Sequence, residues 1–301
     1  MRPDDLYATI TNQLIADIEA GAGDWHMPWH TLASGSPRSI DGHSYRGINA
    51  LWLAMTADNR GWTSGVWATY KAWQRHGAQV RRGERGTAVV LWKPRDLSTE
   101  PNPTDADADA GQPRRLIART FTVFNAEQVD GLDPDPAAVP DTVDDETRID
   151  HAETYFAAIG AQVHLGGNRA YYRPSADTIH LPDLAQFDQP AHFWATAAHE
   201  HIHWTGHSHR LARDLTGRFG SDAYAGEELV AELGAALWSA EAELAPVTRP
   251  DHAAYLAGWL RILRADPRHL LTITSKAQAA LDHLTTTAGH PPAPVPADAL
   301  R

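Results

Sequence analysis

The 301-residue sequence predicts an α+β protein with two domains. Strand-like and helix-like segments are segregated along the chain rather than alternating, which favours α+β over a parallel α/β sheet. A stretch rich in Asp and Pro near the middle separates two parts that are each long enough to bury a core. We expect a first domain at 1–132, a linker at 133–148 and a second domain at 149–290.

The first half predicts three helices and a hairpin. Apolar residues recur every four positions over 5–20, and further helices are expected over 48–58 and 69–76, before Gly61 and Gly77. Two runs at 87–92 and 116–124 have strand character and are expected to pair. Between them, 97–113 is acidic and of low complexity, so it cannot bury apolar area and is expected to be a disordered loop.

The second half predicts a helix over 150–159, a hairpin formed by 170–172 and 178–181, and a helix that runs from Pro190 to Trp204. Further helices are expected over 224–243, 252–264 and 272–285. No apolar run approaches the roughly 20 residues that span a bilayer, and the N-terminus lacks a secretory pattern. We therefore expect a soluble, cytoplasmic protein with no membrane partner.

One helix carries the pattern of a zinc site. The chain has 17 His and no Cys, so a metal site must use His, Asp and Glu. His199 and His203 stand four residues apart and project from the same helix face, as two ligands of one ion must. Glu200, next to His199, can act as the general base of a metallopeptidase.

Three residues compete to be the third ligand. Glu228 and Glu232 share one face of the 224–243 helix, so one can bind the ion while the other supports a ligand imidazole. His209 completes a metzincin-type pattern, but that fold needs a methionine after the motif, and the last Met is at position 55. We favour Glu228 as ligand and Glu232 as support, with one Zn²⁺ per chain. Glu227 points about 100° away on the helix and is expected to be solvated.

These residues predict a hydrolase. Zinc would activate water and polarise a carbonyl group while Glu200 takes the proton. The 178–181 segment is expected to be an edge strand that holds an extended peptide substrate, and Tyr224 is expected to stabilise an oxyanion.

The formal net charge of −12 does not exclude nucleic acid, because the charge is unevenly distributed. Residues 38–95 contain ten Lys and Arg against three Asp and Glu, whereas 96–150 contain four against fourteen. Seven of the 11 Trp lie between 25 and 92, among these basic residues. Aromatic platforms in a basic groove are typical of single-stranded DNA binding, although Trp52 and Trp73 are expected in the core. The residues expected to contact DNA are Trp29, Tyr45, Arg46, Asn49, Trp67, Tyr70, Lys71, Arg81, Arg82 and Lys93.

The sequence resembles the ArdC-type antirestriction proteins of mobile elements. In the first half the resemblance rests on Tyr45-Arg46-Gly47-Ile48-Asn49-Ala50-Leu51, Trp67-Ala68-Thr69-Tyr70-Lys71-Ala72-Trp73, 77–87 and Val123-Phe124-Asn125. In the second half it rests on 199–207, Arg210-Leu211 and 224–234. The resemblance implies a single-stranded-DNA-binding domain, a zincin-like metallopeptidase domain, and protection of DNA from restriction during conjugation. Two alternatives stay open: a DNA-binding protein with a structural metal clamp, and a metallopeptidase without DNA binding.

Overall fold

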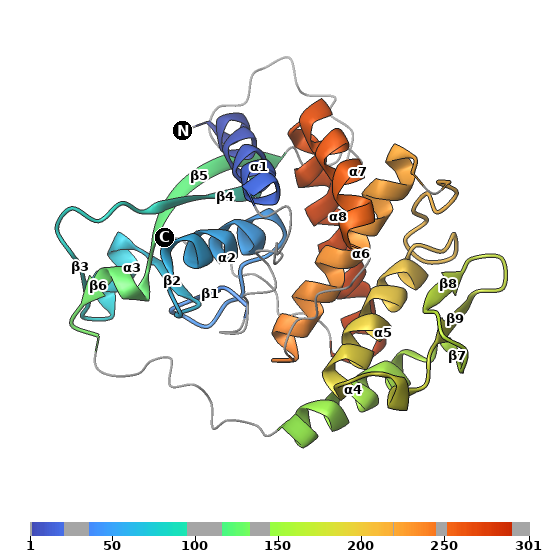
Figure 1. The fold of residues 1–301 in the computed structure, drawn as a ribbon. Coiled ribbons are helices and arrows are strands. Elements are labelled where there is room, and N and C mark those ends of the chain that lie inside the picture. The colour runs from blue at the N-terminus through green and yellow to red at the C-terminus, as the bar shows by residue number, and fades with distance from the viewer. Residues whose placement is uncertain are drawn as a thin grey trace, which may run out of the picture.

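Helices and three small sheets segregate in space as they do in the sequence, which confirms the α+β class (Figure 1). The computed structural model describes residues 2–20, 36–94, 116–132, 145–218, 220–244 and 252–290. Within these residues no helix combines the length and the apolar character needed to cross a membrane. The expected loop at 97–113 and most of the expected linker lie outside the described residues.

A four-stranded sheet organises the first half of the chain. Its order is β1-β2-β5-β4, and the predicted hairpin is confirmed, since β4 and β5 pair antiparallel from Thr87 with Val123 to Pro94 with Leu116. A two-stranded sheet of β3 and β6 lies at one end. The elements are α1 (Pro3–Ala20), β1 (Arg38–Ser39), α2 (Ile48–Arg60), β2 (Val66–Thr69), α3 (Tyr70–Arg75), β3 (Gln79–Val80), β4 (Thr87–Pro94), β5 (Leu116–Asn125), η2 (Ala126–Gln128) and β6 (Val129–Asp130).

The second half packs helices beside a three-stranded sheet of order β7-β9-β8. Its elements are α4 (Asp145–Ile159), β7 (Gln162–Leu165), β8 (Tyr171–Arg173), β9 (Thr178–Leu181), η3 (Leu184–Gln186), α5 (Pro190–Thr205), α6 (Asp222–Glu241), α7 (His252–Ala265) and α8 (Arg268–Thr287). Because α4 begins at Asp145, the last four residues of the expected linker are helical.

The prediction that 178–181 forms an edge strand is wrong. This segment is β9, the middle strand, because β7 pairs with it in parallel on one side and β8 antiparallel on the other. The four residues of β7, between the end of α4 and Gly166, carried too short a pattern to be predicted. The edge strand on the β8 side is therefore 171–173.

The two halves share one hydrophobic cluster. Leu6, Ile10 and Leu14 of α1 are buried in the same cluster as the apolar faces of α6, α7 and α8. Figure 1 shows α1 lying between the β4–β5 ribbon and these C-terminal helices. Hydrogen bonds also cross between the halves: Thr11 Oγ1 donates to the Pro267 carbonyl at 3.0 Å, and the Gly47 amide donates to Gln278 Oε1 at 3.0 Å.

A glycine brings α6 close to α5. A Cβ atom on Gly234 would lie 2.7 Å from Cδ1 of Ile202, inside van der Waals contact. The absence of a side chain at this position therefore allows the two helices to approach closely. Since Ile202 precedes His203 and Gly234 follows Glu228 by less than two turns of α6, this contact brings the candidate metal ligands together.

Candidate metal centre and nucleic-acid surface

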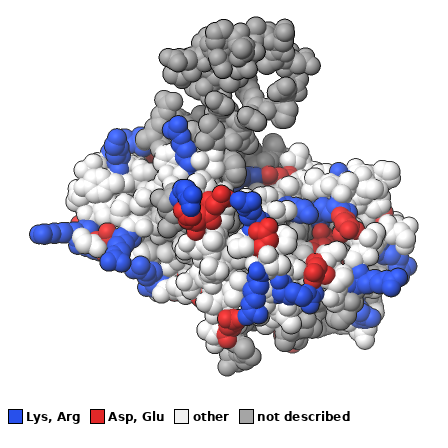
Figure 2. All heavy atoms as spheres, turned by 90° about the horizontal axis from the view of Figure 1, so that it is seen from above, with Lys and Arg blue, Asp and Glu red and all other residues white. Residues whose placement is uncertain are grey.

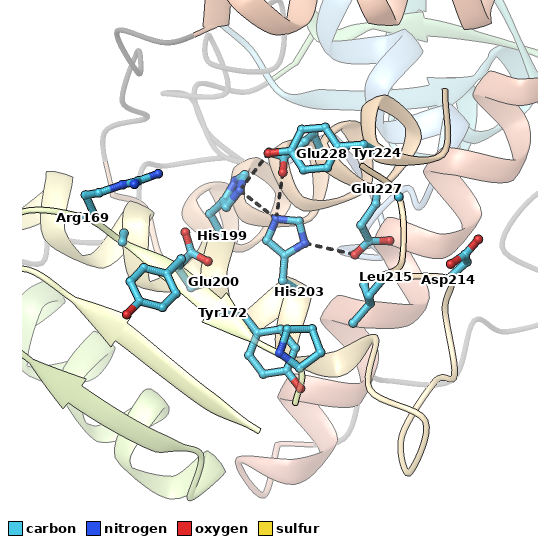
Figure 3. A pocket seen from close by; sticks show the side chains of 14 residues that line it. Arg169, Tyr172, His199, Glu200, His203, Asp214, Leu215, Tyr224, Glu227 and Glu228 are labelled. Carbon is cyan, nitrogen blue, oxygen red and sulfur yellow. Dashed lines mark hydrogen bonds and ion pairs between the residues drawn. The ribbon is translucent and has the colours of Figure 1, made fainter. Parts of the chain in front are cut away.

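The two histidines of the motif converge on one point. They lie one turn apart near the C-terminal end of α5, where His199 is buried and His203 is largely buried. Their Nε2 atoms are 3.1 Å apart, and the rings meet edge to face. Figure 3 shows both rings turned toward the same side of the helix.

Glu228 on α6 supplies the third donor atom. Its two carboxylate oxygens lie 3.6 Å from His199 Nε2 and 3.6 Å from His203 Nε2. One ligand atom from each of the three residues lies within 4.8 Å of the others. Two imidazoles and a carboxylate form a donor set that suits zinc and leaves a further position open. His209, the metzincin-type alternative, is exposed beside His207 and is not part of this group.

A different carboxylate faces the far nitrogen of each imidazole. Glu232 Oε1 lies 3.2 Å from His199 Nδ1, and Glu227 Oε1 lies 3.1 Å from His203 Nδ1. The expectation that Glu227 is solvated is wrong: its side chain is only 11% exposed. The loop between α5 and α6 folds over this face of α6, so a position that helical geometry directs away from Glu228 still meets protein.

The protons of the two histidines follow from these contacts. An ionised carboxylate can only accept a hydrogen bond, so each Nδ1 carries the proton and each Nε2 keeps its lone pair. Three acceptors, two nitrogens and the Glu228 carboxylate, then face one point. Burial alone raises the pKa of Glu228, whereas a hydrogen bond from His199, positive charge at the two imidazoles and a hydrogen bond from Tyr224 lower it, so a cation placed at this point favours the ionised carboxylate.

A cavity of about 410 Å³ opens beside the three candidate metal ligands (Figure 3). Glu200 is buried and lines the cavity next to His199, and Tyr224 lines it from the first turn of α6. The hydroxyl of Tyr224 is engaged with Glu228, so it helps to hold this side chain. Strand β8 forms another wall, and Arg169 stands just before it.

Side-chain contacts hold β8 against the end of α5. Tyr172 donates its hydroxyl to Asp177 at 2.8 Å, and Arg210 donates to Asp177 at 3.0 Å and to Tyr172 at 3.2 Å. Arg210 also donates to the Trp204 carbonyl at 2.6 Å and lies over the Trp204 ring. The cavity wall is therefore tied to the helix that carries both histidines.

Several residues expected to bind DNA are internal. Trp67 is fully buried with Leu53, Val89 and Val123, so its ring offers no face to a base, and this prediction is corrected. Asn49 exchanges hydrogen bonds with the backbone of Val90 and so joins α2 to β4. The ring of Tyr45 packs on the core with its hydroxyl buried, and Arg46 forms an ion pair with Asp282.

Tyr70, Lys71 and Arg82 are exposed near the β3–β6 end of the molecule. Tyr70 is 42% exposed, meets Phe124 edge to face, and accepts a hydrogen bond from Gln79 at 2.7 Å. Figure 2 shows basic side chains projecting at this end, while elsewhere on the face they alternate with acidic ones. Arg81 is instead paired with Glu84 and Asp130. Trp29 and the side chain of Lys93 lie outside the described residues.

Two site residues were not predicted from the sequence in these roles: Glu227, and Arg213 of the loop that follows α5. Arg213 donates to both carboxylate oxygens of Glu227, at 2.8 and 3.0 Å. The two residues are 14 positions apart on different elements, and no spacing rule connects them.

Both halves match known families. Residues 4–124 match the N-terminal domain of anti-restriction factor ArdC, and residues 150–276 match a zincin-like metallopeptidase family. The Mn(II)-bound crystal structure of the antirestriction protein ArdC from plasmid R388 is 36% identical, with 94% of this chain and 97% of that chain covered and a TM-score of 0.75. The metal-free crystal structure of the same protein is 37% identical, with 95% of this chain and 99% of that chain covered and a TM-score of 0.76.

Two curated relatives differ in length. The uncharacterized protein y4eC of Sinorhizobium fredii (strain NBRC 101917 / NGR234) is 45% identical over 287 residues, which cover 93% of this chain and 91% of the relative. The DNA primase TraC of Escherichia coli is 38% identical over 294 residues, which cover 92% of this chain but only 27% of TraC. The chain therefore corresponds to one part of that larger protein.

Proposed function

Because this chain belongs to the ArdC family of antirestriction proteins, we propose that it binds single-stranded DNA through its N-terminal half and a catalytic divalent metal ion through His199, His203 and Glu228. Zinc is the ion we favour, one per chain. Manganese is the ion in the plasmid R388 relative, so both metals belong in the tests. The acceptors that converge between α5 and α6 carry the metal part of this proposal.

The argument for a cation is electrostatic. Two imidazole lone pairs 3.1 Å apart repel one another, and a carboxylate 3.6 Å from both adds negative charge. Bringing several buried acceptors to one point costs free energy unless a donor or a cation lies between them. One divalent ion between the three groups satisfies all of them at once.

A catalytic role is favoured over a structural clamp because the centre is open. Structural zinc sites are closed by four protein ligands, whereas catalytic sites keep a position free. Here three ligands border a cavity of about 410 Å³ that also contains the carboxylate of Glu200. A clamp has no need of either the cavity or a further carboxylate beside the three ligands.

The residues around the cavity have different roles in the proposed peptide hydrolysis. A bound divalent ion supplies Lewis acidity toward a carbonyl group and toward water. Glu200 takes the proton from the attacking water and delivers it to the leaving amine. Within the described residues β8 pairs with a strand on one side only, so its other edge can pair with an extended peptide, and Tyr224 keeps Glu228 in place.

Replacing Glu200 by Gln separates catalysis from metal binding. The variant should bind Zn²⁺ and Mn²⁺ like the parent but lose about 10²–10⁴-fold in cleavage of an unstructured protein such as casein, because the general base is gone. Metal content is measured by mass spectrometry and cleavage by gel and peptide mapping. A parent protein that carries the metal and leaves a broad panel of unstructured peptides intact would favour the structural clamp.

The DNA part rests on the exposed group Tyr70, Lys71 and Arg82. Removing one phosphate contact should reduce the slope of log affinity against log salt by about 0.7 for a single strand. Lys71→Ala and Arg82→Ala should do this in fluorescence anisotropy with labelled single strands. Tyr70→Ala should cost about 1–3 kcal/mol if a base stacks on its ring. Arg264→Ala on α7 is the control and should keep the parental affinity. Unchanged affinity in all three test variants would show that this surface does not bind DNA.

A further inference from the structure

Arg213 lies at a buried junction between the metal helix, the ligand helix and the loop that joins them. The residues from 206 to 218 leave α5 and return to the start of α6, and the Arg213 side chain is only 5% exposed within this loop. Its guanidinium donates to Glu227 Oε1 at 2.8 Å, Glu227 Oε2 at 3.0 Å, Thr205 Oγ1 at 2.7 Å and the Ile202 carbonyl at 2.6 Å.

The two contacts with Glu227 fix the plane of its carboxylate. A planar guanidinium that makes two hydrogen bonds to one carboxylate holds it in one orientation, whereas the ammonium group of a lysine does not. The Oε1 atom fixed in this way is the one that lies 3.1 Å from His203 Nδ1. An unbroken chain of hydrogen bonds therefore runs from Arg213 through Glu227 to a candidate metal ligand.

The contact with Ile202 acts on the same ligand from its backbone. The last carbonyls of a helix have no partner within the helix, and a cation near them is favourable. Arg213 meets the Ile202 carbonyl in the last turn of α5, one residue before His203. The same side chain thus fixes both the backbone and the imidazole of His203.

We propose that Arg213 is a positioning residue for the metal centre: through Glu227 it fixes the tautomer and orientation in which His203 presents Nε2. This inference rests on the proposed metal site. It predicts that the loop after α5 contributes to metal affinity although it supplies no ligand. Outer partners of ligand histidines typically change metal affinity about 10–100-fold when they are lost.

Arg210 in the same loop provides a matched control. It also donates to a carbonyl of the last α5 turn, that of Trp204, and it also holds a carboxylate, that of Asp177. Trp204 follows His203 directly in the chain, but neither the Trp204 carbonyl nor Asp177 contacts the imidazole of a candidate metal ligand. Arg210→Lys therefore loses a pair of hydrogen bonds to a carboxylate, at a more exposed position, without disturbing the contact between Glu227 and His203.

The test compares Arg213→Lys, Arg210→Lys and Glu227→Gln in the full chain. Zinc affinity is measured by competition with a chromogenic chelator, ligand geometry by the visible spectrum of the Co²⁺ form, and metal-free stability by thermal unfolding. We expect Arg213→Lys to weaken zinc binding about 10–100-fold and to change the Co²⁺ spectrum. We expect Arg210→Lys to lower the unfolding temperature while keeping parental zinc affinity and spectrum.

The double variant shows whether the two residues act in series. If Arg213 works through Glu227, then Arg213→Lys combined with Glu227→Gln binds zinc about as weakly as Glu227→Gln alone. Parental affinity and spectrum in folded Arg213→Lys would overturn the inference, whatever its unfolding temperature. Should that variant not fold, parental zinc affinity in Glu227→Gln would overturn it equally. A parent protein that binds neither zinc nor manganese would instead refute the proposed metal site itself.

Discussion

Replacing Glu228 by Gln should abolish metal binding without destabilising the metal-free protein. The amide keeps the shape of the side chain but removes its negative charge, and its neutral oxygen is a much weaker zinc ligand than a carboxylate. In the metal-free protein the amide nitrogen can donate to Nε2 of His199 or His203, which both lie 3.6 Å from the carboxylate oxygens. At a pH where both imidazoles are neutral, a donor then replaces one of three converging acceptors, so the metal-free variant should be at least as stable as the parent.

The size of the metal effect follows from linkage. At a free metal concentration 100 times the dissociation constant, binding stabilises the folded parent by about 2.7 kcal/mol. For a 301-residue chain this raises the unfolding temperature by about 4 °C. If loss of the ligand weakens binding about 100-fold or more, the stabilisation at the same concentration falls to about 0.4 kcal/mol or less.

Differential scanning fluorimetry with and without Zn²⁺ measures both quantities. We expect the parent to show the full shift, and Glu228→Gln to show a shift below about 1 °C from an equal or higher starting temperature. Glu243→Gln, beyond the end of α6, makes the same chemical change at an exposed ion pair with Arg148 and should keep the parental shift. A full shift in Glu228→Gln would refute the assignment of this carboxylate as a ligand.

Three further results are expected. His209→Ala should keep the parental metal affinity in a chelator competition, because His209 is exposed and outside the converging group; a large loss would restore the metzincin-type ligand set. Trp67→Ala should lower the free energy of unfolding in urea by about 3–5 kcal/mol, since a fully buried ring is removed; a change near zero would contradict its burial. Glu241 concerns pH: burial raises the pKa of its carboxyl to about 7, with the charge of Arg46 opposing the rise and the like charge of Asp282 adding to it. Its contribution to stability is then present below the unfolded pKa of about 4.5 and is lost as pH rises through 7. The side chain of Glu241 is nevertheless exposed to solvent, so we expect only a small decline in urea midpoint between pH 4.5 and 7.5 that Glu241→Gln lacks; parallel pH profiles would contradict the raised pKa.

Local patterns predicted the long elements of the fold. Helical periodicity, together with Gly61, Pro190 and Gly206 at helix ends, located α1, α2 and α5 to within a few residues. The short strands β1, β3 and β7 have two to four residues, and they exist because neighbouring strands pair with them. Sequence periodicity cannot detect an element whose stability comes from a distant partner.

Solvent exposure of aromatic residues was the weakest part of the sequence interpretation. Trp67 and Tyr70 lie three residues apart, yet one is fully buried and the other is 42% exposed. Trp67 belongs to strand β2, whose first three residues are buried, whereas Tyr70 begins α3 at the surface. Composition places both residues in one basic, aromatic segment, because composition gives no information on where strand β2 ends and helix α3 begins, at Thr69.

The α6 glutamates explain why helical geometry predicted part of the centre and not the rest. A four-residue spacing places Glu228 and Glu232 on one face, and both reach His199. Glu227 lies off that face, but His203 is one turn further along α5, and its Nδ1 points toward a different side of α6. Two imidazoles that share an ion through Nε2 must direct their Nδ1 atoms apart, so their supporting carboxylates cannot occupy a single face. The carboxylate that supports the second histidine, Glu227, therefore lies about 100° around α6 from Glu228. Its charge can be buried there because Arg213, from the loop after α5, forms an ion pair with it.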